Sequence, residues 1–364
     1  MTILPRAYFN PPRRLPFVLP TPPEGKALVS LAINESPYGC SPVAQAAAQA
    51  RLADLNRYPD PSSAGLRRAI GRQFALDPER IVCGNGSEEL LDVVARMFVR
   101  AGDEIIMSQS GFFQFAVVAA RLGAGLRRAP ERDLVTDVDG LVALVTPKTK
   151  LVFLALPNNP TGTLLPADEV VRLHGRLPPE VVLVLDLAYG EYMDKSGLDR
   201  LMRLGGGRAN VVVTRTFSKA YGLAALRVGW ALAPEWMTPG LNLLRGVGNV
   251  DAIAQAAAAA AVADQDFVDR VVAGTAAERA FMAGGLTRLG LHFVPGHGNF
   301  LLTRFPDEDA RSAANFIDLA MREEGIWLRP VGEPGFANWS RIGLGRRAEN
   351  ERLLGLLEGF LNEP

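Results

Sequence analysis

The chain has 364 residues, of which 48% are hydrophobic and 21% are charged. These proportions are typical of a globular protein, and the length favours two domains over one. Acidic and basic residues number 39 each, so the formal net charge is zero. This balance indicates no electrostatic partner such as a nucleic acid or a membrane surface.

The numbers of cysteines and histidines limit the possible kinds of protein further. Two cysteines, Cys40 and Cys83, are too few for a disulfide framework, which fits a reducing compartment such as the cytoplasm. Three histidines without metal-ligand spacing argue against a zinc site or a histidine triad, so we expect no metal. The first 25 residues are rich in Pro and Arg and predict neither a signal peptide nor a membrane anchor.

The elements in chain order begin with an expected extended arm over residues 1–30. The pattern is helical from Pro42 to Leu55 and again from Ser63 to Leu76, and Ile81–Cys83 is a short apolar strand. Strands and helices then alternate. The predicted strands are Glu104–Met107, Leu151–Leu156, Val181–Leu185, Val211–Thr214 and Val228–Leu232. The predicted helices between them are Glu88–Val99, Phe113–Leu122, Asp168–Arg176 and Leu198–Leu204.

This alternation of continuous β-branched strands with helices predicts an α/β fold, in which helices cover both faces of a mostly parallel sheet. A long helical region from Asn249 to about Leu289 follows. Short strands at Phe300–Arg304, Ile326–Arg329 and Ser340–Leu344 then predict a smaller α+β domain. We therefore divide the chain into an arm and part of the small domain (1–41), a large domain (42–260) and a small domain (261–364).

Lys219 is one of five lysines among the 39 basic residues. It follows the apolar run Val211–Val213 and precedes a glycine turn, whereas the other four lysines lie in stretches that indicate loops. Desolvation at the end of a buried strand lowers the pKa of a lysine and frees its amine to attack an aldehyde. Taken alone, Lys219 is better explained as an exposed lysine at the end of a strand.

A glycine turn, Gly84-Asn85-Gly86-Ser87-Glu88-Glu89, follows the first apolar strand and opens a helix. Small residues expose backbone N–H groups here, and the helix dipole favours an anion such as phosphate. The spacing matches neither a Walker loop nor a dinucleotide fingerprint, which argues against a dinucleotide oxidoreductase. The same residues also suit an ordinary strand-to-helix turn.

Polar residues follow two later strands. Asn159 lies in the turn Pro157–Gly162, at a strand end of the kind where open α/β sheets bind ligands, and its amide can donate to a phenolate-like oxygen. Asp186 ends the next apolar strand, and Tyr189 follows three residues later. A carboxylate in that place needs a partner. The partner is either a protonated ring nitrogen or the turn that follows, which Asp186 would cap.

Three arginines are candidates for anion binding. Arg227 lies eight residues after Lys219 and is able to share an anion with Ser218 and the glycine turn. Arg329 and Arg341 lie near the C-terminus, and the planar guanidinium group suits a carboxylate or a phosphate. For each arginine taken alone, a surface ion pair is the alternative.

The motifs Asn-Pro-Thr-Gly, Asp-x-x-Tyr, Ser-Lys-Ala and the following Arg, in this order and spacing, resemble the aspartate aminotransferase superfamily of pyridoxal-phosphate enzymes. The resemblance extends from about Leu31 to Leu344. Within it, Asn34–Gly39, Arg57–Pro61 and Gly84–Glu89 look like the histidinol-phosphate aminotransferase branch. It implies the fold type I architecture of these enzymes, with a large domain around a mostly parallel sheet and a smaller α+β domain.

The resemblance also implies a role for each matched residue. Lys219 would hold the cofactor pyridoxal 5'-phosphate covalently and move the proton, while Asp186 would keep the ring nitrogen protonated. The other cofactor contacts would come from backbone N–H groups of Gly86, Ser87 and Glu88, from Phe112, Asn159, Tyr189, Ser218 and Arg227, and from Tyr58 of a second subunit. The substrate contacts would be Arg341 for the α-carboxylate and Arg329 and Tyr38 for a phosphate.

The implied activity is transamination between a small-molecule amino donor and an oxo-acid acceptor, with histidinol phosphate and 2-oxoglutarate as the implied pair. Four departures from the family pattern bear on the substrate: Leu187 replaces the usual Glu, Ser36 replaces the commoner Asn, Phe112 lacks the hydroxyl of the commoner Tyr, and the stretch Gly248–Asp251 lacks the aromatic residue often seen before Asn-Val in this branch. An aminotransferase for aromatic or other amino acids and a lyase similar to threonine-phosphate decarboxylase therefore remain alternatives. A cofactor-sensing regulator is disfavoured, because the chain is not basic. The role of Tyr58 implies a homodimer with shared active sites.

Overall fold

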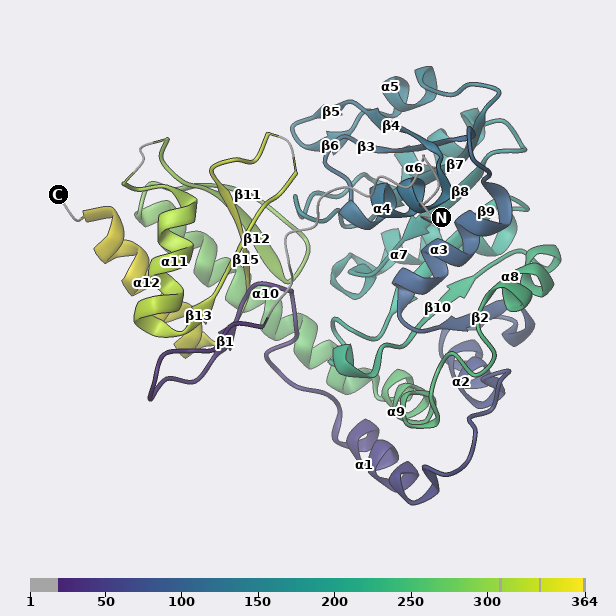
Figure 1. Ribbon diagram of the computed structural model, residues 1–364, viewed down its shortest axis with the longest axis horizontal. Helices are drawn as coiled ribbons and strands as arrows, with labels where there is room; N and C mark the ends of the chain where they lie inside the picture. Colours follow the sequence, from purple (N-terminus) through teal and green to yellow (C-terminus); the bar gives the residue numbers. More distant parts are fainter. Residues whose placement is uncertain (1–18, 308–309, 334, 363–364) are drawn as a thin grey trace, which may run out of the picture.

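The computed structural model describes residues 19–307, 310–333 and 335–362, and its elements lie around a seven-stranded and a four-stranded sheet (Figure 1). The predicted arm lies outside the described residues as far as residue 18. Further along the arm, β1 (Val29–Ser30) pairs in parallel with β13 (Ile326–Trp327), so the start of the described chain joins a segment near its end. Within these ranges no helix has both the length and the apolar character that a membrane crossing requires.

The two helices expected before the first large-sheet strand are confirmed. The first, α1 (Pro42–Arg51), begins with a proline, whose missing N–H is not needed in the first helical turn. A short 3-10 turn, η1 (Leu52–Asp54), extends it. The second helix, α2 (Ala64–Phe74), follows a turn in which the Asp60 carboxylate accepts hydrogen bonds from nearby backbone N–H groups.

The large sheet has the strand order β2-β10-β9-β8-β7-β3-β4. Only β10 runs antiparallel to its neighbours in this sheet, so the prediction of a mostly parallel sheet is confirmed. Its strands are β2 (Ile81–Gly84), β3 (Glu104–Ser108), β4 (Gly125–Ala129), β7 (Thr149–Ala155), β8 (Val182–Asp186), β9 (Val211–Thr216) and β10 (Gly229–Leu232). Strand β4 was not predicted, because this edge strand carries two arginines and few apolar residues.

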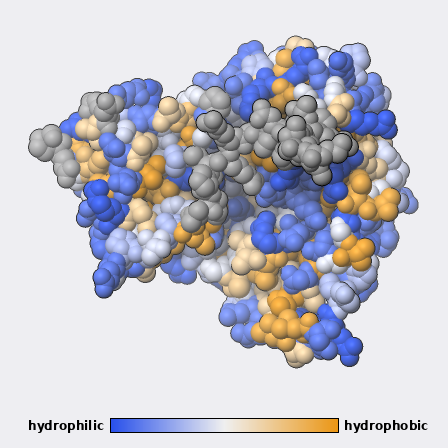
Figure 2. Space-filling view, in the orientation of Figure 1, coloured by the Kyte–Doolittle hydropathy of each residue, from blue (hydrophilic) through white to orange (hydrophobic). Residues whose placement is uncertain are grey.

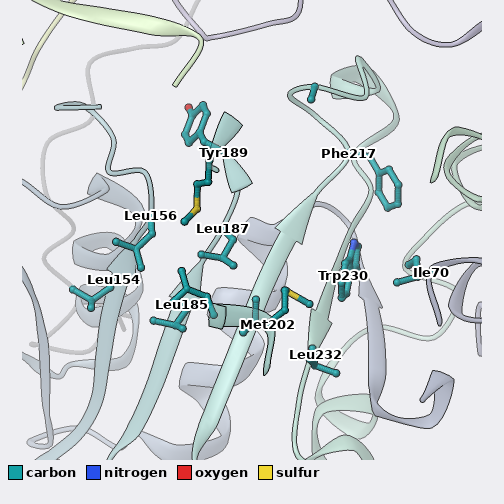
Figure 3. Close-up of a cluster of buried hydrophobic side chains, with 14 of the residues drawn as sticks. Ile70, Leu154, Leu156, Leu185, Leu187, Tyr189, Met202, Phe217, Trp230 and Leu232 are labelled. Atoms are coloured by element: carbon teal, nitrogen blue, oxygen red, sulfur yellow. The ribbon is translucent and has the colours of Figure 1, made fainter. Parts of the chain in front are cut away.

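Helices cover both faces of the large sheet, and successive strand residues point to opposite faces. Val213 and Leu185 belong to the hydrophobic cluster on one face, part of which Figure 3 shows, while Val212 and Val184 belong to the cluster on the other. The first cluster packs against α2, α5 (Val138–Ala143), α6 (Ala167–Arg176), α7 (Lys195–Gly207) and α9 (Ala252–Ala263). The second packs against α3 (Ser87–Phe98), α4 (Phe113–Leu122) and α8 (Thr238–Leu244). The hairpin strands β5 (Glu131–Arg132) and β6 (Val135–Thr136) lie outside the main sheet.

The long helical region predicted from Asn249 to Leu289 is divided into two helices, α9 and α10 (Gln265–Arg288). Asp264 separates them, because its carboxylate accepts a hydrogen bond from the Phe267 N–H and so starts a new helix. The Ser41 hydroxyl donates to the same carboxylate at 2.5 Å, which ties the start of α1 to this junction.

The smaller sheet has the order β11-β12-β15-β14 and is antiparallel. Its elements are β11 (His292–Val294), β12 (Phe300–Arg304), β14 (Arg329–Pro330) and β15 (Trp339–Gly343), with α11 (Ala313–Glu324) and α12 (Arg347–Asn362) beside them. The predicted strand Ile326–Arg329 is two strands, β13 and β14, which join different sheets. The division into domains stays a prediction, and its boundary at residue 260 falls inside α9.

The loop assignment for the other four lysines is wrong for two of them. Lys150 lies in β7 and Lys195 begins α7, whereas Lys26 and Lys148 lie in turns or irregular segments. Lys150 was assigned to a loop because the apolar run that predicted the strand begins only at Leu151. Strand β7 in fact begins two residues earlier, at Thr149.

We expect replacement of Phe153 by alanine to destabilise the fold strongly. Phe153 is fully buried and stacks on Phe115 with ring centroids 4.6 Å apart. Loss of a buried aromatic ring in a packed core costs about 3–5 kcal/mol in the free energy of unfolding. Denaturant-induced unfolding of the variant measures this loss. Phe153→Leu, which keeps part of the volume, should lose clearly less, and equal losses for both variants would contradict the packing described.

Candidate functional site

A cavity of about 500 Å³ lies at the carboxyl ends of the parallel strands of the large sheet. Residues that follow β7, β8 and β9 line it, as do residues at the start of α3 and α4 and the arginines of β14 and β15. Parallel strands bring their carboxyl ends to one edge, and that edge is the usual ligand site of an open α/β sheet. The cavity brings together most of the residues that the sequence singled out.

Lys219 extends from the turn after β9 into this cavity. Its Nζ donates to the backbone oxygens of Ile33 and Asn34, at 3.1 Å each. Burial of the amine, reinforced by the nearby Arg341 and Arg227 guanidinium groups, lowers the pKa of Lys219 to about 7. A substantial fraction of the amine is therefore neutral and nucleophilic near neutral pH.

Asp186 is the last residue of β8 and is 3% exposed, with its carboxylate at the cavity wall. The Thr214 hydroxyl donates to Asp186 Oδ1 at 3.0 Å. Burial raises the pKa of Asp186 to about 6, although the hydrogen bonds from Thr214 and from the Ala188 backbone and the nearby Lys219 amine oppose this rise. A cation against this carboxylate would lower its pKa again, so Asp186 is suited to pair with a protonated ring nitrogen.

The start of α3 and the segment before β10 form a cradle for an anion. Gly86 has φ +79° and precedes Ser87, the first residue of α3; a Cβ at Gly86 would lie only 2.5 Å from Arg227 Nη2. The guanidinium therefore approaches the helix N-terminus closely because position 86 has no side chain. Ser218 Oγ accepts hydrogen bonds from Thr216 Oγ1 at 3.0 Å and Arg227 Nη1 at 3.2 Å, so its own hydrogen remains to donate.

Two polar groups face the cavity between the cradle and the small sheet. The Asn159 oxygen accepts a hydrogen bond from Arg341 Nη1 at 2.6 Å, which leaves the amide nitrogen of Asn159 as a donor. The Tyr189 oxygen accepts one from Asn34 Nδ2 at 2.8 Å, so the Tyr189 hydroxyl hydrogen is also left to donate. Both donors suit an oxygen atom that carries negative charge.

Arg329 and Arg341 lie directly opposite each other on the paired strands β14 and β15, and both line the cavity. Opposed residues of an antiparallel pair point to the same face of a sheet, which gives the cavity two adjacent guanidinium groups. Arg341 Nη2 also donates to the Ala32 oxygen at 2.6 Å, and the Arg329 guanidinium lies 5.7 Å from the centre of the Phe113 ring. This wall of the cavity is suited to carboxylate or phosphate groups.

The structure places the remaining predicted residues in two groups. Phe112, at the start of α4, and Glu88, in α3, line the cavity. Tyr58 is 99% exposed and lies outside the cavity of its own chain. Tyr38 lies outside it as well, with Arg346 over its ring at 5.4 Å, so its contact with a substrate phosphate stays a prediction.

Asn34 is the main residue of the cavity to which the sequence analysis assigned no role. It is buried, adopts φ +58°, and contributes both its side chain and its backbone oxygen to the contacts of Tyr189 and Lys219. The sequence signal for Asn34 was its place in the stretch Asn34–Gly39, which looks like the histidinol-phosphate aminotransferase branch. Its contact with Lys219 was not predictable, because the two residues are far apart in the sequence. Thr214 was also missed, although a threonine that directly follows three valines in a buried strand is a usable signal of a polar partner.

Comparison with known proteins gives the family. The family model described as aminotransferase class I and II matches residues 26–357. A histidinol-phosphate aminotransferase from Nitrobacter hamburgensis is 40% identical over 342 residues, which are 94% of this chain and 93% of that protein. One from Paramagnetospirillum magneticum is 42% identical over 334 residues and 92% of each chain.

A solved structure of another histidinol-phosphate aminotransferase has a similar fold. The histidinol-phosphate aminotransferase from Sinorhizobium meliloti, in complex with pyridoxal-5'-phosphate, superposes with a TM-score of 0.87 at 32% identity, over 92% of this chain and 91% of that one. The predictions of an α/β aminotransferase fold, of an aminotransferase activity and of pyridoxal phosphate as the cofactor are thereby confirmed. The chain belongs to the class I and II aminotransferase family.

Proposed function

We propose that the chain transfers the amino group of histidinol phosphate to 2-oxoglutarate. The observation that carries this proposal is the pair of opposed arginines, Arg329 and Arg341, in the cavity that holds Lys219. Histidinol phosphate bears a phosphate group and no carboxylate, whereas 2-oxoglutarate bears two carboxylates. Two adjacent guanidinium groups accept either kind of anion. The relatives at 40% and 42% identity are histidinol-phosphate aminotransferases, which supports the same substrate.

The cradle at the start of α3 is proposed to hold the cofactor phosphate. Backbone N–H groups of Gly86, Ser87 and Glu88 point from a helix N-terminus, where the dipole favours an anion. The hydrogen of Ser218 and the guanidinium of Arg227 complete the set. The close approach of Arg227 to Gly86, which a Cβ would prevent, fits a site built for a doubly charged group.

The rest of the cavity wall is proposed to orient the cofactor ring. Asp186 pairs with the ring nitrogen, and Asn159 and Tyr189 donate to the ring hydroxyl oxygen. Phe112 covers one face of the ring without contributing a hydrogen bond. When bound, pyridoxal phosphate supplies an aldehyde that condenses with an amine and a cationic ring that accepts electrons from the substrate Cα.

Lys219 is proposed to be both the point of attachment and the base. Because its pKa lies at about 7, Lys219 Nζ is able to take the proton from the substrate Cα and return it at the neighbouring carbon. Arg341 holds the α-carboxylate of the amino or oxo acid, and Arg329 the phosphate of histidinol phosphate. These two contacts fix which Cα bond is presented for cleavage, and loss of the proton there gives transamination.

The functional unit is proposed to be a homodimer in the cytoplasm, without nucleic-acid or membrane partners. Tyr58 is 99% exposed, and Leu55 (69%), Leu52 (53%) and Val43 (54%) are exposed close to it in the chain. Figure 2 shows a hydrophobic area over the α1 region of the molecule. A second copy that covers this area would take Tyr58 out of solvent and bring it to the cofactor phosphate of that copy.

We expect the Lys219 amine to react with an acylating reagent at much lower pH than an ordinary lysine. Only the neutral amine reacts, and a pKa of about 7 makes most of it neutral by pH 8. Competitive labelling of the cofactor-free protein, followed by peptide mass spectrometry, gives the midpoint. Lys195, which is exposed, serves as the internal control. A Lys219 midpoint as high as that of Lys195 would show that the amine is not desolvated.

Arg329→Gln should weaken the use of histidinol phosphate selectively. Loss of a charge-assisted hydrogen bond to the phosphate costs about 1.5–3 kcal/mol, which is roughly a 10- to 150-fold fall in kcat/KM. In the Arg329→Gln variant, turnover of an amino donor without a phosphate, such as phenylalanine, should change far less. Arg341→Gln should instead impair the use of 2-oxoglutarate as the acceptor. Equal efficiency of phosphorylated and unphosphorylated donors in the unmodified protein would refute the role of Arg329. Release of carbon dioxide from a donor that carries an α-carboxylate, such as threonine phosphate, without an oxo-acid requirement would refute transamination.

A mixture of two defective variants tests the shared site. If Tyr58 acts in the neighbouring subunit, a dimer of one Lys219→Ala chain and one Tyr58→Ala chain contains one site without any lesion. Random reassortment makes half of the dimers mixed, so activity should return to roughly a quarter of the unmodified level. No gain over the sum of the separate variants would mean that Tyr58 serves its own chain or that the protein is not a dimer.

A further inference from the structure

A buried ion pair, Arg215–Glu191, lies on the face of the large sheet that carries the first hydrophobic cluster. Arg215 Nη2 donates to Glu191 Oε1 at 2.5 Å, and the two side chains are 2% and 5% exposed. The Arg215 guanidinium lies 4.7 Å from the centre of the Phe74 ring and 5.6 Å from that of Trp230. The pair is thus held in place by aromatic side chains inside an apolar core.

Stability alone is a poor reason for this pair. Removing two charges from water is expensive, and well-packed apolar residues of similar volume often stabilise a core as well or better. Arg215 Nε and Nη1 and Glu191 Oε2 find no hydrogen-bond partner in the described protein, so the desolvation of these atoms is only partly offset. The arrangement is better explained by what it holds together.

The two partners belong to the two segments that deliver the reactive groups. Glu191 lies in the 3-10 turn η3 (Gly190–Tyr192), directly after the stretch from Asp186 to Tyr189. Arg215 lies in β9, four residues before Lys219. The threonines on either side of Arg215 point to the opposite face of the sheet and donate to Asp186 and to Ser218, so the part of β9 that carries Arg215 contacts the site through both neighbours.

Strand pairing does not hold these two segments together at the site, because the hydrogen bonds between β8 and β9 end before Tyr189 and Lys219. The register of β8 with β9 stops at the pair Asp186 and Thr214, followed by one further hydrogen bond from the Leu187 N–H to the Thr214 oxygen. Tyr189 and Lys219 both lie beyond that point, and the Lys219 Nζ is 5.6 Å from the centre of the Tyr189 ring. Contacts other than the pairing of β8 with β9 therefore set their separation, among them those of Asn34 with both residues.

We propose that the Arg215–Glu191 pair is a positioning device, which holds the Tyr189 hydroxyl at its working distance from the Lys219 amine. The pair touches neither substrate nor cofactor, and Arg215 and Glu191 act through the segments on which they lie. The proposal rests on the roles proposed above for Tyr189 and Lys219. It explains why a costly charge pair lies just beneath the site and at the level where the β-ladder ends.

Two variants, Glu191→Gln and the double variant Arg215→Met/Glu191→Leu, distinguish an effect on the stability of the fold from an effect on the position of Tyr189 relative to Lys219. The single change leaves an unpaired buried arginine and should lower both the melting temperature and kcat. The apolar pair should return the melting temperature to that of the unmodified protein or above. It should nevertheless keep a kcat reduced by 10-fold or more, because the tie is still missing, while the KM for 2-oxoglutarate changes little.

A spectroscopic readout does not depend on the substrate. A hydrogen bond from Tyr189 to the cofactor oxygen stabilises negative charge there and makes the attached Lys219 nitrogen less basic. A displaced Tyr189 should therefore raise the pH midpoint of the visible absorbance of the cofactor-loaded protein, in the single and the double variant alike. This shift remains measurable even if histidinol phosphate proves not to be the substrate, so the two proposals fail separately.

Glu104→Gln is the control, because Glu104 also accepts a hydrogen bond from an arginine, Arg127, but lies at the amino end of β3, away from the cavity. It should leave kcat and the absorbance midpoint unchanged. A double variant at positions 191 and 215 with normal kcat and a normal midpoint would overturn the proposal and make the pair merely structural. Equal effects of Glu104→Gln would overturn it too.

Discussion

An amine that is removed from water near other cations holds its proton weakly, and this constraint shapes the whole site around Lys219. The carboxyl edge of the large sheet desolvates the amine, and Arg341 and Arg227 add to the effect. Asp186 lies in the same cavity and is affected in the opposite direction, because burial makes its carboxylate hold a proton more tightly. A ligand with an aldehyde near Lys219 and a cationic ring nitrogen near Asp186 relieves both penalties at once. The site is therefore suited to such a group.

The fold provides this arrangement by bringing together segments that are far apart in the sequence. Strand ends supply Asp186 and the turn that carries Lys219, while the smaller sheet supplies the two arginines. The segment around Asn34 joins these parts, because its backbone oxygens accept from Lys219 and from Asn299, and its side chain donates to Tyr189. The segment around Asn34 therefore connects Lys219, Tyr189 and Arg341 through hydrogen bonds.

The sequence was informative wherever a local pattern has a local cause. The β-branched strands around Val212 and the glycine turn at Gly86 predicted the sheet and the cradle, because strand alternation and helix N-termini depend on neighbouring residues. Edge strand β4 and hairpin β5–β6 were missed, since they are short and polar and are held by partners elsewhere in the chain. The contacts of Asn34 and the Arg215–Glu191 pair were also beyond reach, because each joins residues that only the tertiary fold brings together.

The most direct test of the account is chemical trapping of the cofactor on the protein. The protein loaded with pyridoxal phosphate would be treated with borohydride, digested and analysed by peptide mass spectrometry. The account predicts that the pyridoxyl group becomes fixed to the peptide that contains Lys219, and that no other lysine is modified in proportion to the cofactor bound. A modified peptide that contains any of the other four lysines, with Lys219 left free, would contradict it.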